Sequence, residues 1–567
     1  MKKVRLLLET KSQVLIAVLI AFTIILTLGA AILMHSRSAR TSAKLETDIQ
    51  RAYVLAQNGL TIGDSGATGT YNIGGGTVTV TLDAGKGEIK SEAIYQGSTQ
   101  TLTKSYVPTT LPPTTWAKSY GTSFGRDRAY LVTQTVGGYI LAGDTEKTKK
   151  GGLGNGSYDL LLIKVDSAGK KQWAYAYGGS GSEVPDVNTI QKANSGYILA
   201  TDTYSLSSNS ELLMIKVDDN GGLTWASAFQ GSSYDRPIAV RQTSDGGYLL
   251  SGFTTSFGAL GYATLLIKTD SAGKIGLNAD PSVKTWARMY DFFENANEFP
   301  GDILEDTVTK QYIIAGDIFH SNDYDGIVFG VNADDGVITF QKRFGGANYE
   351  RFSSISAASD GGYILGGWTA SAGAAGSQDN FWLMKIDTSG NKSWDKVYDE
   401  NLLNQRVGDL KTLSDGYLLS GRSFGAAGTD EILVLKTDLT GNNVLMSKVC
   451  GQGSGSETAY SIEKTSDADA GYIFGGYTAS YPPDPLFNFM VIKTDSAGEL
   501  KCVTNICSNP QKLVVGDGNI PEKSGFSLNV STPSGLDDVN VGPAPGSGII
   551  TRTTDIVSGV VETPICE

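Results

Sequence analysis

The sequence predicts a mainly β chain whose bulk is a seven-bladed β-propeller, preceded by a transmembrane helix and a small α+β stalk. Three patterns that recur between residues 115 and 507 predict the propeller: a glycine–tyrosine pair that opens an apolar run, a Lys-x-Asp triplet that closes another, and two aromatic residues four positions apart. Such internal self-similarity is the sequence signature of repeat architectures. The chain has 567 residues, 40% of them hydrophobic, and is long enough to bury a large core.

The first two patterns give the same number of repeats. The glycine–tyrosine pair occurs at Gly138-Tyr139, Gly196-Tyr197, Gly247-Tyr248, Gly362-Tyr363, Gly416-Tyr417 and Gly471-Tyr472, with Gln311-Tyr312 as a degenerate copy. The triplet begins at Lys164, Lys216, Lys268, Lys385, Lys436 and Lys493, with Gly330-Val331-Asn332 in the missing place. Successive tyrosines are 51 to 64 residues apart, which suits a four-stranded propeller blade. An open β-solenoid is the alternative, although the repeat is long for it.

The aromatic pairs are interpreted as core residues that pack the repeats together. They are Trp116 and Tyr120, Trp173 and Tyr177, Trp225 and Phe229, Trp286 and Tyr290, Phe340 and Phe344, and Trp394 and Tyr398. Even spacing places both rings on one face of a strand. The Asp-x-x-Gly-x-x-x-Trp run over residues 166–173 resembles the tryptophan-docking motif of quinoprotein-type propellers, with one residue fewer, and that resemblance implies contact between blades. The Asp-to-Gly turns are also possible calcium loops, but each offers too few carboxylates for the six or more oxygens that calcium takes.

The N-terminus predicts a membrane anchor. A charged stub over residues 1–13 precedes 21 uncharged, mostly apolar residues, 14–34, which at 1.5 Å per residue can cross a bilayer core of roughly 30 Å. We expect a retained single-pass helix, with a cleaved secretory signal as the alternative. The helical pattern continues to about residue 58, and alternating segments at 74–82 and 88–95 predict strands.

Residues 1–106, with this stub, long helix and small sheet, resemble a type IV pilin, most closely a minor pilin with a PilX-like N-terminus. The resemblance implies a pilin-like helix and sheet over residues 35–106, a place in or near a type IV pilus, and other pilin-like subunits as partners. The chain departs from the pattern at Lys11-Ser12-Gln13, where pilin precursors carry the glycine after which they are cut. A Pro/Thr-rich linker, 107–114, follows, and residues 508–567 read as a Gly/Pro/Ser-rich tail or small β-module.

Charge excludes nucleic acid as a partner. The chain has a net charge of −13, and residues 1–51 carry eight basic and three acidic residues, so the rest of the chain has a net charge of −18. An acidic body of this size repels phosphate backbones.

Cysteine and histidine usage limits the chemistry. The four cysteines, Cys450, Cys502, Cys507 and Cys566, are candidates for disulfides in an oxidising compartment, with their pairing open. Cys450 and Cys507 share a register position in successive repeats, whereas Cys502 takes the place of a repeat tryptophan. Only His35 and His320 are present, too few for a multi-histidine metal site and unfavourable for a catalytic Ser-His-Asp or Cys-His set. We predict no catalytic residue, no metal ligand and no cofactor.

The fourth repeat is the most irregular. It contains Asp291 and Glu294 in an acidic aromatic run and the repeats' one histidine, His320. Divergence of one repeat indicates either a grafted ligand site or simple drift. These three residues are the candidate ligand-site region.

The sequence therefore predicts an extracellular, membrane-anchored protein at the cell surface whose propeller binds a glycan or protein in adhesion. It is expected to be a binding protein rather than an enzyme. The alternatives are a carbohydrate-active enzyme, either a glycoside hydrolase or a lyase, which works with two carboxylates and no histidine, and a structural surface spacer.

Overall fold

The computed structural model describes residues 69–105 and 115–566, with short internal gaps such as 147–157, 501–506 and 541–550. The chain divides into two compact units, Met1–Pro112 and Pro113–Glu567. The described residues are built from β-strands, which confirms the mainly β prediction. The stub, both predicted helical segments and the 107–114 linker lie outside the described residues. Within the described part, no helix is long and apolar enough to cross a membrane.

The first unit contains one antiparallel sheet. Its strands follow one another in the order β1 (Gly69–Ile73), β2 (Gly76–Asp83), β3 (Glu88–Tyr95) and β4 (Ser98–Ser105). Val78, Val80 and Ala93 are buried. The two strands predicted for this region are β2 and β3, whereas β1 and β4 are additional.

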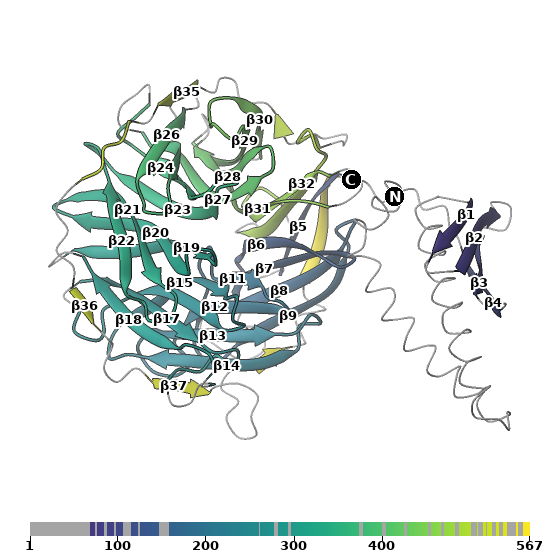
Figure 1. Ribbon diagram of the computed structural model, residues 1–567, viewed down its shortest axis with the longest axis horizontal. Helices are drawn as coiled ribbons and strands as arrows, with labels where there is room; N and C mark the ends of the chain where they lie inside the picture. Colours follow the sequence, from purple (N-terminus) through teal and green to yellow (C-terminus); the bar gives the residue numbers. More distant parts are fainter. Residues whose placement is uncertain are drawn as a thin grey trace. The chain divides into compact units, whose positions relative to one another are not determined.

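The second unit consists of seven antiparallel sheets arranged around a common centre (Figure 1). Sheet 1 contains β6 (Asp127–Thr135), β7 (Gly138–Glu146), β8 (Tyr158–Asp166) and β9 (Lys171–Gly178). Sheet 2 contains β10 (Glu183–Val184), β11 (Ile190–Lys192), β12 (Tyr197–Thr203), β13 (Glu211–Val217) and β14 (Leu223–Gln230). Sheet 3 contains β15 (Asp235–Gln242), β16 (Tyr248–Thr254), β17 (Ala263–Thr269) and β18 (Trp286–Asp291).

The remaining sheets repeat this plan. Sheet 4 contains β19 (Asn297–Asp306), β20 (Gln311–His320), β21 (Asp323–Asn332) and β22 (Ile338–Phe344). Sheet 5 contains β23 (Glu350–Ala357), β24 (Tyr363–Thr369), β25 (Asn380–Ile386) and β26 (Lys392–Asp399). Sheet 6 contains β27 (Gln405–Leu413), β28 (Gly416–Phe424), β29 (Asp430–Thr437) and β30 (Val444–Cys450). Sheet 7 contains β31 (Glu457–Lys464), β32 (Tyr472–Thr478), β33 (Asn488–Thr494) and β5 (Trp116–Thr122).

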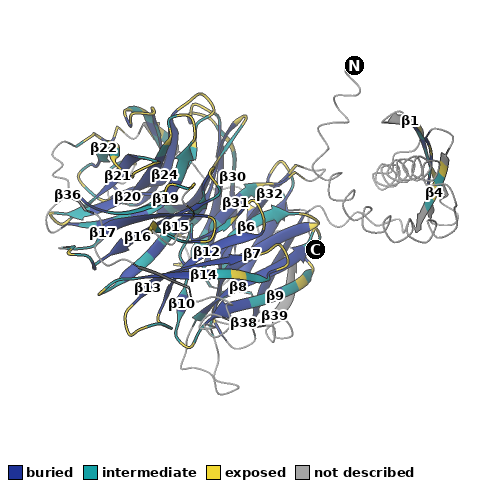
Figure 2. Ribbon diagram, turned by 60° about the horizontal axis from the view of Figure 1, so that its bottom comes forward, coloured by how far each residue is buried: buried dark blue, intermediate teal, exposed yellow. Residues whose placement is uncertain are grey.

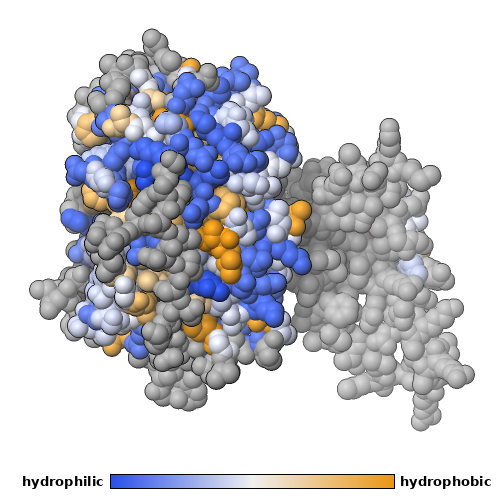
Figure 3. Space-filling model, turned by 60° about the vertical axis from the view of Figure 1, so that its left-hand side comes forward, coloured by the Kyte–Doolittle hydropathy of each residue, from blue (hydrophilic) through white to orange (hydrophobic). Residues whose placement is uncertain are grey.

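The three sequence patterns fall on fixed strands of the sheets, and sheet 6 lacks the aromatic pair. The repeat tyrosines lie at or next to the start of the second strand, the triplets at the end of the third, and the aromatic pairs on the fourth. The second and third strands are buried along almost their whole length, as the blue strands of Figure 2 show. The exposed wall in Figure 3 is largely hydrophilic, with small hydrophobic patches. The apolar residues of the repeats thus pack sheet against sheet.

Sheet 7 takes its fourth strand from the start of the repeat region. β5 pairs antiparallel with β33, and Trp116 lies opposite Lys493 in the register that Trp173 and Lys164 occupy in sheet 1. The tryptophan position that the repeat register assigned to Cys502 is therefore filled by Trp116. Cys502 itself lies outside the described residues.

The aromatic pairs connect neighbouring sheets. The Tyr120 hydroxyl donates to the Gly169 carbonyl (2.5 Å) and the Tyr177 hydroxyl to the Gly221 carbonyl (2.7 Å), each in the turn of the next sheet. Gly169 has a φ of 77°, and a Cβ there would lie 3.1 Å from the Trp116 ring. Only glycine suits such a turn, because it needs both positive φ and close ring contact. The interpretation of the aromatic pairs as packing residues is confirmed.

The C-terminal segment follows the outer edges of all seven sheets. Six short strands belong to it: β34 (Cys507–Ser508), β35 (Val514–Asp517), β36 (Asn529–Ser531), β37 (Asp537–Asn540), β38 (Thr551–Thr553) and β39 (Val560–Cys566). They pair with the fourth strands of sheets 6, 5, 3, 2, 1 and 7, and Glu522 forms a bridge with Phe344 of sheet 4. We call residues 507–566 the belt. Where the sequence predicts a tail or a separate module, these described segments extend the sheets.

A disulfide fixes the start of the belt. Cys450 at the end of β30 bonds to Cys507 of β34, the pair that shares a register position in the repeats. Cys566 lies in β39, opposite Ala117.

Candidate functional site

A pocket of about 290 Å³ lies where the innermost strands of the sheets meet. In sheet 1 and in sheets 3 to 7 the innermost strand contains a β-bulge, which re-aims a side chain and bends the strand. Five of the six bulged residues line this central pocket: Ile238, Gly301, Ser353, Gly408 and Tyr460. A repeated local irregularity of the backbone thus builds the wall of the pocket.

The glycines among these residues allow the innermost strands to approach one another. A Cβ on Gly301 would lie 2.5 Å from the Phe352 carbonyl oxygen, and one on Gly408 would lie 2.5 Å from the Ala459 carbonyl oxygen. Both contacts are with the backbone of the next sheet, which cannot move aside cheaply. These two positions therefore require glycine.

Sheet 2 departs from this pattern and supplies polar side chains. Its innermost strand is split into β10 and β11, and five residues, 185–189, stand opposite two, 200–201. The intervening turn is held by its own hydrogen bonds, including Thr189 Oγ1 to the Asp186 carbonyl at 2.6 Å. This places Asp186 and Asn188 on the pocket wall.

Asn188 ties the turn to three other sheets. Its side-chain amide donates to the Gly301 carbonyl (3.0 Å) and to the Ser353 carbonyl (3.1 Å). Its own carbonyl accepts from the Val240 backbone N–H at 3.1 Å. The turn that carries Asp186 is therefore rigidly positioned.

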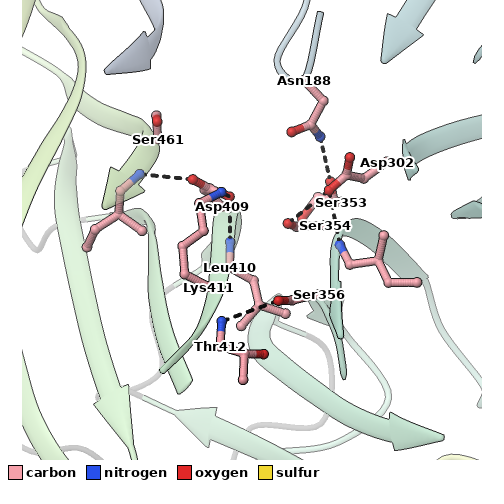
Figure 4. A network of polar contacts seen from close by, with 12 residues as sticks. Asn188, Asp302, Ser353, Ser354, Ser356, Asp409, Leu410, Lys411, Thr412 and Ser461 are labelled. Carbon is pink, nitrogen blue, oxygen red and sulfur yellow. Dashed lines mark hydrogen bonds and ion pairs between the residues drawn. The ribbon is translucent and has the colours of Figure 1, made fainter. Parts of the chain in front are cut away.

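Buried aspartates connect the innermost strands around the centre (Figure 4). Asp302 of sheet 4 accepts from the Ile355 N–H of sheet 5 at 3.2 Å and is paired with Arg241 of sheet 3. Asp409 of sheet 6 accepts from the Ile462 N–H of sheet 7 at 3.0 Å. Burial raises the pKa of Asp302, and Arg241 opposes that shift. These carboxylates serve the architecture rather than a ligand.

Arginine–carboxylate pairs surround the central pocket on one face of the ring. They are Arg128 with Asp144 (2.6 Å), Arg236 with Asp186 (3.1 Å), Arg351 with Asp317 (2.8 Å) and Arg406 with Asp379 (2.6 Å). Asp186, Asp317 and Arg351 line the pocket directly. Because each cation has a carboxylate partner, the face is polar without a large excess of either charge.

Aromatic rings accompany these arginines. The Arg351 guanidinium lies 5.8 Å from the centre of the Trp368 ring and 5.1 Å from that of Tyr324, and Arg406 lies 4.7 Å from Trp368. Trp368 lines the pocket together with Phe253 and Phe299. The pocket therefore combines flat apolar faces with hydrogen-bonding groups, the usual composition of a small-molecule site.

Asp317 and Asp202 on this face have raised pKa values. Burial raises the pKa of Asp317 to about 6, against the opposing charge of Arg351. Burial also raises the pKa of Asp202 to about 6, against the opposing charge of Arg236. A carboxyl that holds its proton near neutral pH is a candidate proton donor.

The predicted ligand-site residues lie away from this pocket. Asp291 ends β18 in sheet 3, His320 ends β20 in sheet 4, and Glu294 lies outside the described residues. The His320 ring contacts the Ser321 hydroxyl at 2.9 Å, in the hairpin between β20 and β21. The structure places Asp291 and His320 in different sheets.

Sequence reasoning missed Asp186 and Asn188, although a signal was present. Where sheets 1 and 3 begin with Asp-Arg, sheet 2 reads Glu183-Val184-Pro185-Asp186 and lacks the arginine. This departure from the repeat places Asp186 and Asn188 on the wall of the central pocket.

Metal ligation has no support in the described residues, where no group of three or more His, Cys, Asp or Glu side chains is placed to hold an ion. The aspartates that begin the turns are engaged by the backbone. Asp166 Oδ1, for example, accepts from the Ala168 N–H (3.0 Å) and the Lys170 N–H (2.8 Å). Their role is to cap the turn.

No family model matches this sequence, and no curated protein matches it. Among solved structures, a puromycin hydrolase variant in complex with PGG is 11% identical, with 73% of this chain and 59% of that chain covered and a TM-score of 0.28. An endo-1,5-α-L-arabinanase from Thermotoga petrophila RKU-1 in complex with Tris is 9% identical, with coverages of 76% and 98% and a TM-score of 0.19. A xylan β-1,4-xylosidase from Bacillus halodurans C-125 is 9% identical, with coverages of 83% and 96% and a TM-score of 0.15.

The chain thus covers less than two thirds of the puromycin hydrolase. With TM-scores below 0.5, these similarities establish neither the fold nor the activity of this chain. Both are argued from its own geometry.

Proposed function

We propose that residues 115–507 form a closed seven-bladed β-propeller that binds a neutral saccharide in the central pocket, at the surface of the cell. Closure is supported by the pairing of β5 with β33 and by hydrogen bonds between innermost strands, such as Ser461 Oγ to the Val132 carbonyl at 3.2 Å, which joins sheet 7 to sheet 1. The residues that line the central pocket support a saccharide as the ligand.

A saccharide presents many hydroxyls and flat C–H faces, and the pocket offers partners for both. Asp186 and the Arg351–Asp317 pair provide charged hydrogen-bonding groups, which bind more strongly than neutral ones. Trp368, Phe253 and Phe299 provide ring faces. The pairing of Arg128, Arg236, Arg351 and Arg406 with carboxylates favours an uncharged ligand over an anionic one.

A glycan array tests this proposal. The full chain is expected to bind neutral oligosaccharides in preference to sulfated or uronic ones. Asp186→Asn should weaken that binding at least about tenfold, because it replaces a charged acceptor by a neutral amide of the same shape. The control is Asp280→Asn, an exposed carboxylate in the loop between β17 and β18 at the opposite end of the strands, which should bind as the parent does. Equal binding by the two variants, or binding of acidic glycans alone, would contradict the proposal.

The membrane anchor and the pilin-like base are also proposals. They rest on the 21 uncharged residues 14–34 and on the resemblance of residues 1–106 to minor pilins. In this proposal the anchor holds the propeller outside the membrane, next to other pilin-like subunits. Release of the protein from membranes by carbonate wash would contradict it, whereas extraction by detergent alone would support it.

Glycoside hydrolysis is the second candidate function. It is favoured by two carboxyl groups that line the central pocket, Asp186 and Asp317, and burial raises the pKa of Asp317 to about 6. Glycosidases use a pair of carboxyl groups that flank the bond to be cleaved. Release of new reducing ends from the bound oligosaccharides, lost in Asp317→Asn, would establish hydrolysis, and their recovery intact would leave binding as the function.

A further inference from the structure

A second cavity lies beside the central pocket on the same face of the ring. Its volume is about 700 Å³, and it is lined by loop residues of sheets 4, 5 and 6, among them Asn322, Asn348, Tyr349, Asn404 and Arg406. These residues lie in or next to the loops before the innermost strands and after the second strands, where the residues around the central pocket also lie. We call this cavity the outer pocket.

One aromatic wall runs between the two pockets. Arg406 lines the outer pocket and lies over Trp368, which lines the central pocket. On the other side, Tyr349 packs edge-to-face on Tyr324 with ring centres 5.4 Å apart, and Arg351 of the central pocket lies over Tyr324. A chain-like ligand can therefore pass from one pocket to the other over continuous rings and guanidinium planes.

The charges of the outer pocket are compensated. Asp379 pairs with Arg406 at 2.6 Å, and Asp323 pairs with Lys523 of the belt at 3.3 Å. A metal cation and an anionic group are both disfavoured, because each would have to displace an existing ion pair.

Amides and one exposed ring supply the groups for a neutral ligand. Each of the three asparagine amides carries one acceptor and two donors. Two are held in place by the backbone: Asn348 donates to the Ala370 carbonyl at 3.1 Å, and Asn404 accepts from the Asp379 N–H at 3.1 Å. Tyr349 is 45% exposed and offers a face for stacking.

We infer that the outer pocket is a second saccharide subsite, so that the ligand is an oligosaccharide extending from the centre of the ring across sheets 4, 5 and 6. This inference rests on the proposed function of the central pocket. It adds that affinity depends on the length of the saccharide and that Tyr349 sets this dependence without touching the central unit.

Isothermal titration with a length series of one neutral oligosaccharide, taken from the array, tests the inference. Affinity should rise at least about tenfold from the disaccharide to the hexasaccharide. Tyr349→Ala should abolish this gain and leave disaccharide affinity unchanged, while Tyr349→Phe should restore it because the ring is retained. Tyr204→Ala is the matched control, since Tyr204 is 39% exposed in the loop between β12 and β13 of sheet 2. It should retain the full gain.

The outcomes separate the inference from the proposed function. Saccharide binding that does not change with length, or a gain that survives in Tyr349→Ala, overturns the outer subsite and leaves the central one intact. Absence of saccharide binding by the parent protein overturns both. A gain lost equally in Tyr349→Ala and Tyr204→Ala also overturns the inference, because it indicates a general change of the face.

Discussion

At the scale of single residues, the acids that begin the innermost strands hold the ring together. Six of the seven sheets have Asp or Glu as the first or second residue of the innermost strand: Asp127, Glu183, Asp235, Glu298, Glu350 and Glu457, with Gln405 in sheet 6. Asp127 Oδ2 accepts from the Thr122 N–H (2.6 Å) and hydroxyl (3.0 Å), and Glu350 accepts from the Gly346 N–H (2.6 Å). Asp127 and Glu350 thus fix the segments that enter their sheets. These side chains are structural, although as isolated buried acids they resemble catalytic groups.

Asp127 makes stability depend on pH. Burial raises its pKa to about 7, above its ordinary value of 3.8, so between these values the folded protein holds a proton that the unfolded chain has lost. The contribution of Asp127 to the free energy of unfolding is therefore fully present below about pH 4 and is lost as pH rises through 7. Each pKa unit corresponds to about 1.4 kcal/mol, so the loss is at most about 4 kcal/mol. Urea unfolding at pH 5 and pH 8 should show a smaller difference for Asp127→Asn than for the parent, and an unchanged difference would contradict the assignment.

Among the structural elements, neighbouring sheets are linked by tyrosine hydroxyls, and the effect of one such link on the free energy of unfolding can be measured. Tyr177→Phe removes the bond to the Gly221 carbonyl while keeping the ring. The buried carbonyl then lacks this donor, and we expect a loss of about 1–2 kcal/mol in the free energy of unfolding. Urea denaturation measures it, with Tyr204→Phe as the exposed control, which should change little. Equal stability of the two variants would show that water replaces the lost donor.

The sequence predicts the elements whose side chains alternate or recur and misses those that depend on a distant partner. The second strands are predicted because their apolar runs and the tyrosines, such as Tyr139 and Tyr197, follow one pattern. The strand that carries Trp116 and Tyr120 is predicted, but its pairing with β33 is missed because Trp116 lies far in sequence from its partner Lys493. The belt is missed for the same reason: a strand such as β36, with three residues, is specified by the edge it meets and not by a periodicity of its own.

Part of the candidate site can likewise be predicted from the sequence, and part depends on distant partners. The sequence predicts a ligand site in an irregular repeat and directs attention to Asp291, Glu294 and His320 there. The central residues Asp186 and Asn188 become a site only when other sheets bring Gly301 and Ser353 within hydrogen-bond distance of Asn188. No local sequence pattern predicts these contacts.

At the scale of the whole molecule, the belt protects the outer edges of the sheets. Exposed edge strands present unpaired backbone groups that pair with other chains. Removal of residues 509–567 should therefore lower the melting temperature and cause concentration-dependent association, whereas a chain that ends at residue 553 uncovers only the β5 edge and should show a smaller effect. Differential scanning calorimetry and light scattering measure both. A monomeric truncated chain with the parent's melting temperature would contradict a protective role.

The direction of the belt has a consequence for biogenesis. The repeats are synthesised from sheet 1 to sheet 7. Sheets 1 and 7 nevertheless receive their outermost strands, β38 and β39, from residues 551–566. In addition, β5 can pair with β33 only after β33 has been synthesised. Early repeats therefore leave the ribosome with open strand edges, and long-range strand pairing is slow. The outer edges of sheets 1 and 7 are in this way covered only after residues 551–566 have been synthesised.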